Sequence, residues 1–156
     1  TGMIFMIVIG AGLYNTFLAL SQLPQETAQL VAGSGLSPWL VLVGILVIYV
    51  VLGCFMDSLS MILLTIPVFF PIVTVLDFGL TPEEFAIWFG ILVLIVVEVG
   101  LITPPVGMNL FVINSMAKDI PIMHTYRAVL PFVASDMIRT AILVAFPAIT
   151  LFLLRI

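Results

Sequence analysis

Charged residues are scarce in this chain. Only 8% of its 156 residues are charged, against about 25% in soluble domains, while 63% are hydrophobic. Four basic residues against eight acidic ones leave a net charge of -4, so the chain lacks a basic surface for nucleic acid. The composition is typical of a polytopic membrane protein surrounded by the lipid bilayer.

Cysteine and histidine are nearly absent too. The single Cys54 excludes a disulfide within the chain and a thiolate metal cluster, and it is expected to be a small buried hydrophobe. His124 has no second histidine with which to form a metal site. The chain begins in apolar sequence without the basic stretch and cleavage site of a signal peptide, and we interpret it as part of a longer subunit.

The apolar segments predict an all-α membrane protein. Residues 3–20 predict a first transmembrane helix, because about 18 residues at about 1.5 Å each cross most of the hydrocarbon core. Residues 25–36, polar and then glycine-rich, predict a short amphipathic surface segment. Residues 120–130 predict an interfacial segment, and residues 131–155, opened by Pro131, predict the last transmembrane helix.

Residues 38–76 contain two apolar arms, each about 15 residues or about 23 Å long, which is short for a full crossing. Ser37 and Pro38 mark a helix start before the first arm, and Asp57 lies between the arms. The segment is either a pair of short crossings or a re-entrant helical hairpin with Asp57 near its tip.

The most informative stretch runs from Glu98 to Asn109 and reads EVGLITPPVGMN. Two consecutive prolines remove two backbone donors, and the carbonyls that they free need partners in protein, water or an ion. Residues 83–117 therefore predict a transmembrane helix broken at 100–107. Transporters place discontinuous helices of this kind at their binding sites.

The distribution of charge favours the hairpin. The segment 118–127 carries Lys118 and Arg127, whereas the connections at 21–37 and 77–84 carry acids and neither Lys nor Arg. By the positive-inside rule the first segment is cytoplasmic and the other two are external. Residues 38–76 then enter and leave on one side, and residues 83–117 cross.

This topology brings both interruptions to the same depth, where unwound carbonyls and a threonine hydroxyl can bind sodium. We predict Gly53, Gly100, Thr103 and Val106 as ligands, mainly through backbone oxygens, while Asp57 and Asn109 orient the loops or bind substrate. A purely structural interpretation stays open. Glycines and prolines also serve as packing and kink positions in membrane helices, and buried acids can bond to neighbouring backbone.

Three segments resemble a known family: GCFMD at 53–57 with Pro67 and Pro71 downstream, the Glu98–Asn109 stretch followed by LFV, and RAVLPF at 127–132. They resemble the C-terminal half of the large, DctM-like membrane subunit of tripartite ATP-independent periplasmic (TRAP) transporters. The resemblance runs from residue 3 to the end of the chain.

The resemblance implies one inverted repeat of an elevator-type symporter, with Na+ as coupling ion, no other cofactor and no enzymatic activity. Such systems import an organic anion, here a C4-dicarboxylate or a sugar acid, delivered by a periplasmic binding protein. A small membrane subunit is the other partner, and the bacterial or archaeal inner membrane is the location. The four predicted ligands would form the second sodium site. The candidate substrate-binding or gating residues are Asp57, Ser58, Glu98, Pro104, Pro105 and Asn109.

Three alternatives remain at this stage. A dicarboxylate or citrate carrier of the same superfamily would work without a binding protein. An intramembrane acid protease would need Asp57 and Glu98 within reach of one water. A structural membrane subunit would tolerate replacement of Pro104 and Pro105 by helix-forming residues.

Overall fold

The computed structural model describes residues 2–104, 106–116 and 120–152, and every regular element in them is a helix. This confirms the all-α class, whereas Pro105 and Lys118 lie outside the described residues. Three helices, α1, α5 and α7, are long and apolar enough to cross a membrane. The helices are α1 (Gly2–Ser21), α2 (Leu23–Gly33), α3 (Pro38–Gly53), α4 (Ser58–Thr74), α5 (Pro82–Ile102), α6 (Met108–Met116), α7 (Ile122–Ala145) and α8 (Pro147–Leu151).

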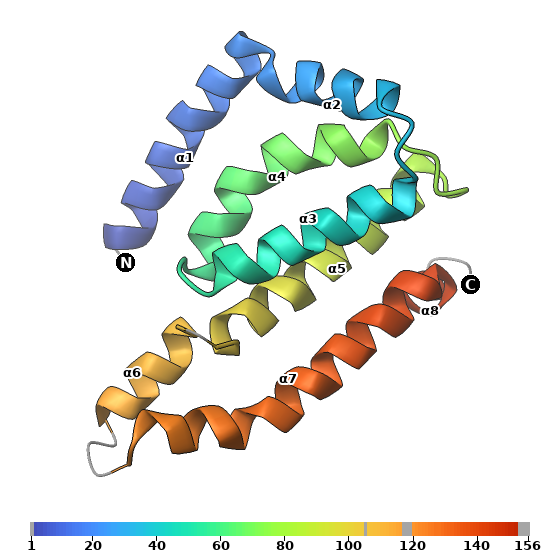
Figure 1. The fold of residues 1–156 in the computed structure, drawn as a ribbon. Helices are drawn as coiled ribbons and strands as arrows, with labels where there is room; N and C mark the ends of the chain where they lie inside the picture. The colour runs from blue at the N-terminus through green and yellow to red at the C-terminus, as the bar shows by residue number, and fades with distance from the viewer. Residues whose placement is uncertain (1, 105, 117–119, 153–156) are drawn as a thin grey trace.

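Two helices begin at a hydroxyl followed by proline. The Ser37 side chain accepts a hydrogen bond from the Leu40 N–H at the start of α3. At the start of α5, Thr81 accepts from the Glu84 N–H while the Glu84 carboxylate accepts from the Thr81 N–H, which is a capping box. Both starts lie at the same end of the molecule, on the right of Figure 1, whereas the end of α6 and the start of α7 lie at the opposite end.

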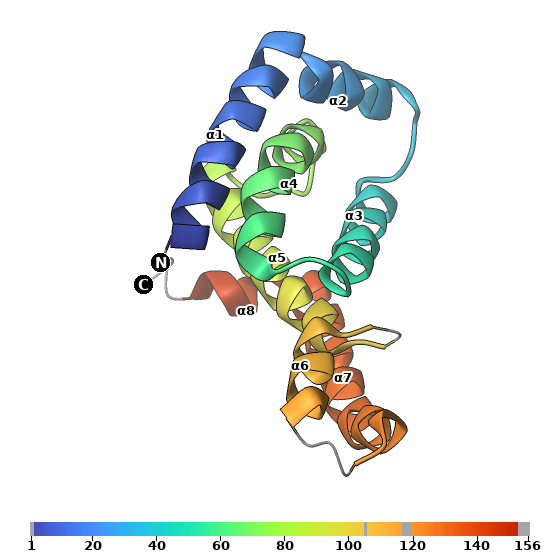
Figure 2. The same ribbon diagram turned by 90° about the vertical axis from the view of Figure 1, so that its left-hand side faces the viewer.

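Helix α5 is the central element and packs on α3, α4, α6, α7 and α8. Helix α4 turns back from the end of α3, and α1 and α2 cover it on the side away from α5 (Figure 2). The largest buried side chains line these contacts: Trp88, Phe89 and Leu92 on α5, Tyr49 on α3 and Met61 on α4. The core therefore lies around the first four turns of α5.

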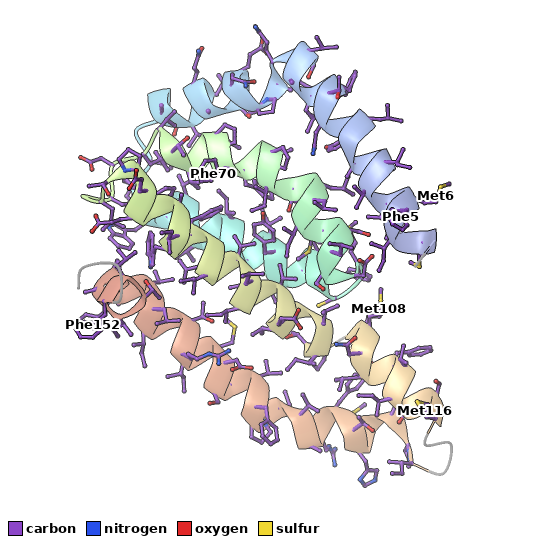
Figure 3. The ribbon with its side chains drawn as sticks, turned by 180° about the vertical axis from the view of Figure 1, so that it is seen from behind. Phe5, Met6, Phe70, Met108, Met116 and Phe152 are labelled. Atoms are coloured by element: carbon purple, nitrogen blue, oxygen red, sulfur yellow. The ribbon has the colours of Figure 1, made fainter. Side chains whose placement is uncertain are left out.

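Much of the outer surface is apolar. Phe5 and Met6 on α1, both labelled in Figure 3, are 63% and 73% exposed. Such a surface suits contact with lipid or with further protein rather than water.

Helix α7 differs from the sequence-based expectation. One helix spans residues that were divided into an interfacial segment at 120–130 and a crossing from Pro131, and that proline lies inside it. A proline removes only one donor, so a long helix can continue through it. The helix ends instead at Phe146, whose φ of -126° and ψ of 76° are not helical, because the residue before Pro147 is disfavoured in the α conformation.

Candidate functional site

The end of α3 lies directly against the end of α5. A Cβ atom placed on Gly100 would lie 2.8 Å from the Gly53 Cα and 2.9 Å from the Val50 carbonyl oxygen. One placed on Gly53 would lie 3.0 Å from the Gly100 Cα. The fold therefore brings two of the four predicted ligand residues into backbone contact, where the α3–α4 turn meets the break between α5 and α6 (Figure 1).

The prolines explain why carbonyls are open at the end of α5. In a continuous helix the Gly100 and Leu101 carbonyls would accept from residues 104 and 105, which are both proline. The Gly100 carbonyl accepts instead from the Thr103 N–H at 3.1 Å. Prolines also stand three and four residues after Leu101, so the Leu101 carbonyl can accept neither a 3₁₀-type nor an α-type helical hydrogen bond. The spacing of the prolines could have identified the Leu101 carbonyl as an open oxygen, although Leu101 was not among the predicted ligands.

The end of α3 leaves another carbonyl open. The Val50, Val51 and Leu52 carbonyls each accept from an N–H of residues 54–56. Within the described residues no hydrogen bond reaches the Gly53 carbonyl oxygen. An oxygen ligand is therefore available where the α3 and α5 backbones touch.

Cys54 joins the α3–α4 turn to the break. Its thiol lies 3.5 Å from the Thr103 carbonyl oxygen and 3.3 Å from that of Val50, and its side chain is buried. The Thr103 hydroxyl donates to the Val99 carbonyl at 2.6 Å. Because its proton is used in this bond, its oxygen can still act as a ligand. Cys54 thus contributes a polar contact between two elements, beyond the hydrophobic role expected from sequence.

Val106 is connected to a different element. Its carbonyl accepts from the Tyr126 hydroxyl of α7 at 3.0 Å. The next residue, Gly107, has a φ of +51°, and a Cβ there would lie 3.2 Å from the Thr103 carbonyl oxygen. A glycine is therefore needed at the turn into α6. Tyr126 was missed because nothing in the local sequence indicates that α7 returns to the break.

The polar candidates for substrate contact lie at two helix starts. Asp57 precedes α4, and its carboxylate accepts from the Ser60 N–H at 2.9 Å, so it is a helix cap. Ser58 is the first residue of α4 and is partly buried. Asn109 lies exposed in the first turn of α6, next to Met108, which Figure 3 labels beside the end of α5. Pro104 is partly buried within the break.

Glu98 is on another face of α5. It is exposed, whereas Gly100 is buried against α3, because two residues along a helix turn the side chain by about 200°. In the described part of the chain Glu98 and Asp57 share no hydrogen bond. The pair of acids that an acid protease would require is therefore not formed by a direct contact.

Comparisons with known proteins agree on one family. The family model for the DctM component of the tripartite ATP-independent periplasmic transporter matches residues 1–149. The C4-dicarboxylate TRAP transporter large permease protein DctM of Pseudomonas aeruginosa is 37% identical over 151 residues, which are 97% of this chain and 34% of that protein. No solved structure matches.

Two further relatives are named for other substrates. The sialic acid TRAP transporter large permease protein SiaM of Vibrio cholerae is 31% identical over 98% of this chain and 34% of that protein. The ectoine TRAP transporter large permease protein TeaC of Halomonas elongata is 30% identical over the same shares. The chain thus spans about a third of the length of these curated relatives.

Proposed function

This chain belongs to the DctM family, the large permease component of TRAP transporters, and on that basis we propose that it forms one repeat of a sodium-coupled symporter for an organic anion. The complete subunit would act with a small membrane subunit and a periplasmic binding protein in the inner membrane. The repeat would supply a re-entrant hairpin, α3–α4, and a broken transmembrane helix, α5–α6, to an elevator-type mechanism.

The contact between Gly53 and Gly100 carries the sodium proposal. It sets the open Gly53 carbonyl beside the end of α5, where Gly100, Thr103 and the proline-released carbonyls lie. A sodium ion bound by these oxygens would hold the hairpin tip against the broken helix. Substrate and sodium would then tighten each other's binding by the same factor.

The anion proposal rests on two helix starts and on the relatives. Helices α4 and α6 begin on either side of this contact, and a helix N-terminus carries a partial positive charge that favours anions. Relatives named for C4-dicarboxylate and sialic acid favour a dicarboxylate or a sugar acid as substrate. A carrier without a binding protein is the second candidate, and uptake that does not require the binding protein would favour it.

Thermal unfolding of the complete detergent-solubilised permease tests the sodium site. We expect a higher Tm in sodium than in potassium at equal ionic strength, growing with concentration as mass action requires. Thr103→Ala, which removes a side-chain oxygen at the break, should reduce this difference. Identical curves in both salts would instead support proton coupling or a structural role for the break.

A further inference from the structure

The Val106 carbonyl is held between a backbone turn and a side chain from another helix. The Tyr126 hydroxyl of α7 donates to this carbonyl oxygen at 3.0 Å. On its C-terminal side the positive φ of Gly107 turns the chain into α6. The direction of the carbonyl is therefore determined by α7 as well as by the break itself.

A neighbouring bond keeps this part of α7 against α6. The Thr125 hydroxyl lies 3.1 Å from the Asn114 side-chain oxygen, and α6 packs on α7 along this stretch. The Tyr126 side chain is partly buried. A stiff aromatic ring presented from a packed helix can hold its hydroxyl in one place with little entropy to lose.

The break is thus held from two sides. The Cys54 thiol from the α3–α4 turn reaches the Thr103 carbonyl at 3.5 Å, and the Tyr126 hydroxyl reaches the Val106 carbonyl. A hydroxyl is a stronger hydrogen-bond donor than a thiol. The contact with α7 is therefore the stronger constraint on the geometry of the break.

We propose that Tyr126 is a positioning residue for the cation site, orienting the Val106 carbonyl toward the ion. A carbonyl oxygen has two lone pairs, so it can accept from Tyr126 and coordinate a cation together. This inference rests on the proposed function, because it requires sodium at the break. Ion binding and the position of α7 would then be linked reciprocally.

The test is a sodium titration of the complete solubilised permease at constant ionic strength, with potassium as the replacing ion. Tyr126→Phe removes the donor and keeps the ring, and it should raise the half-saturating sodium concentration about three- to tenfold. Thr125→Val is the matched control, because it removes the neighbouring α6–α7 bond without changing the break. It should lower the Tm in both salts equally and leave the half-saturating concentration unchanged.

Sodium-dependent uptake into proteoliposomes, measured at saturating substrate, gives the half-saturating concentration independently of unfolding. A wild-type value for Tyr126→Phe in a permease that responds to sodium would overturn the role of Tyr126 and leave the sodium site standing. An equal shift of the half-saturating sodium concentration in both variants would show only a general loss of packing. This result would also overturn the role of Tyr126. A wild-type permease without a sodium response would overturn both proposals.

Discussion

Two glycines let the backbones of α3 and α5 touch. The added Cβ atoms at Gly53 and Gly100 would meet mainly backbone atoms, which cannot move aside as a flexible side chain can. A Cβ atom placed on Gly44 of α3 or on Gly90 of α5 would instead lie in open space. The same residue type in the same two helices is therefore sterically required at one site and replaceable at another.

Gly100→Ala should destabilise the protein by about 1–3 kcal/mol, because the methyl group would overpack the contact with α3. Gly90→Ala is the matched control on the same helix, and it should be neutral or stabilising by up to about 1 kcal/mol. Thermal unfolding of the two variants and the wild type measures the difference. Equal stability of the two variants would contradict the close approach of the backbones.

At the scale of the helices, prolines release carbonyls that neighbouring helices satisfy. Pro147 cannot donate to the Leu143 carbonyl four residues earlier, and the Trp88 indole N–H of α5 donates to it at 2.9 Å. Pro67 likewise leaves the Leu63 carbonyl to the Asn15 amide of α1, at 3.5 Å. Inside a membrane no water is present to bond to a carbonyl that a proline has freed. A donor from a neighbouring helix takes this role and joins the two helices.

Trp88→Phe should cost about 1–3 kcal/mol, since it leaves the Leu143 carbonyl without its donor. In a Pro147→Ala background the same substitution should cost less, because residue 147 then supplies an N–H to this carbonyl. A double-mutant cycle on thermal unfolding measures the coupling between the two positions. Additive effects would mean that Trp88 stabilises the protein through ring packing alone.

At the scale of the whole molecule, the helices begin and end at different levels along α5. The α2–α3 and α4–α5 connections lie at one end, the end of α6 and the start of α7 lie at the other, and the α3–α4 turn lies between them beside the break (Figure 1). A membrane perpendicular to α5 would place the first two connections on one side. The α3–α4 hairpin would then enter and leave from that side.

Cysteine labelling tests this arrangement in a Cys54→Ala background of the complete permease. Ser34→Cys and Glu83→Cys should react with an impermeant maleimide added to spheroplasts, and His124→Cys should react only in inside-out vesicles. This expectation follows from the positive-inside rule, which predicts that the acidic connections are external and the basic one is cytoplasmic. Labelling of residues 34 and 83 from opposite sides would exclude the hairpin.

Several features of the fold could be predicted because they depend on local chemistry. Ser37–Pro38 and Thr81–Pro82 specify helix starts through a hydroxyl cap and a fixed φ, and α3 and α5 begin at these prolines. Pro131 was predicted to open the last crossing, whereas α7 continues through it, because a proline signal does not state whether a helix ends or continues. Whether the helix continues depends on which groups bond to the backbone carbonyls that the proline leaves free.

The sequence by itself determined the all-α class, the apolar surface and the family, since composition, proline spacing and a run such as GLITPPVG are properties of the chain alone. Only the tertiary structure decided that Gly53 touches Gly100, that Glu98 faces elsewhere, and that Tyr126 reaches the break. These relations join residues tens of positions apart. They depend on how whole helices pack, which local propensities do not specify.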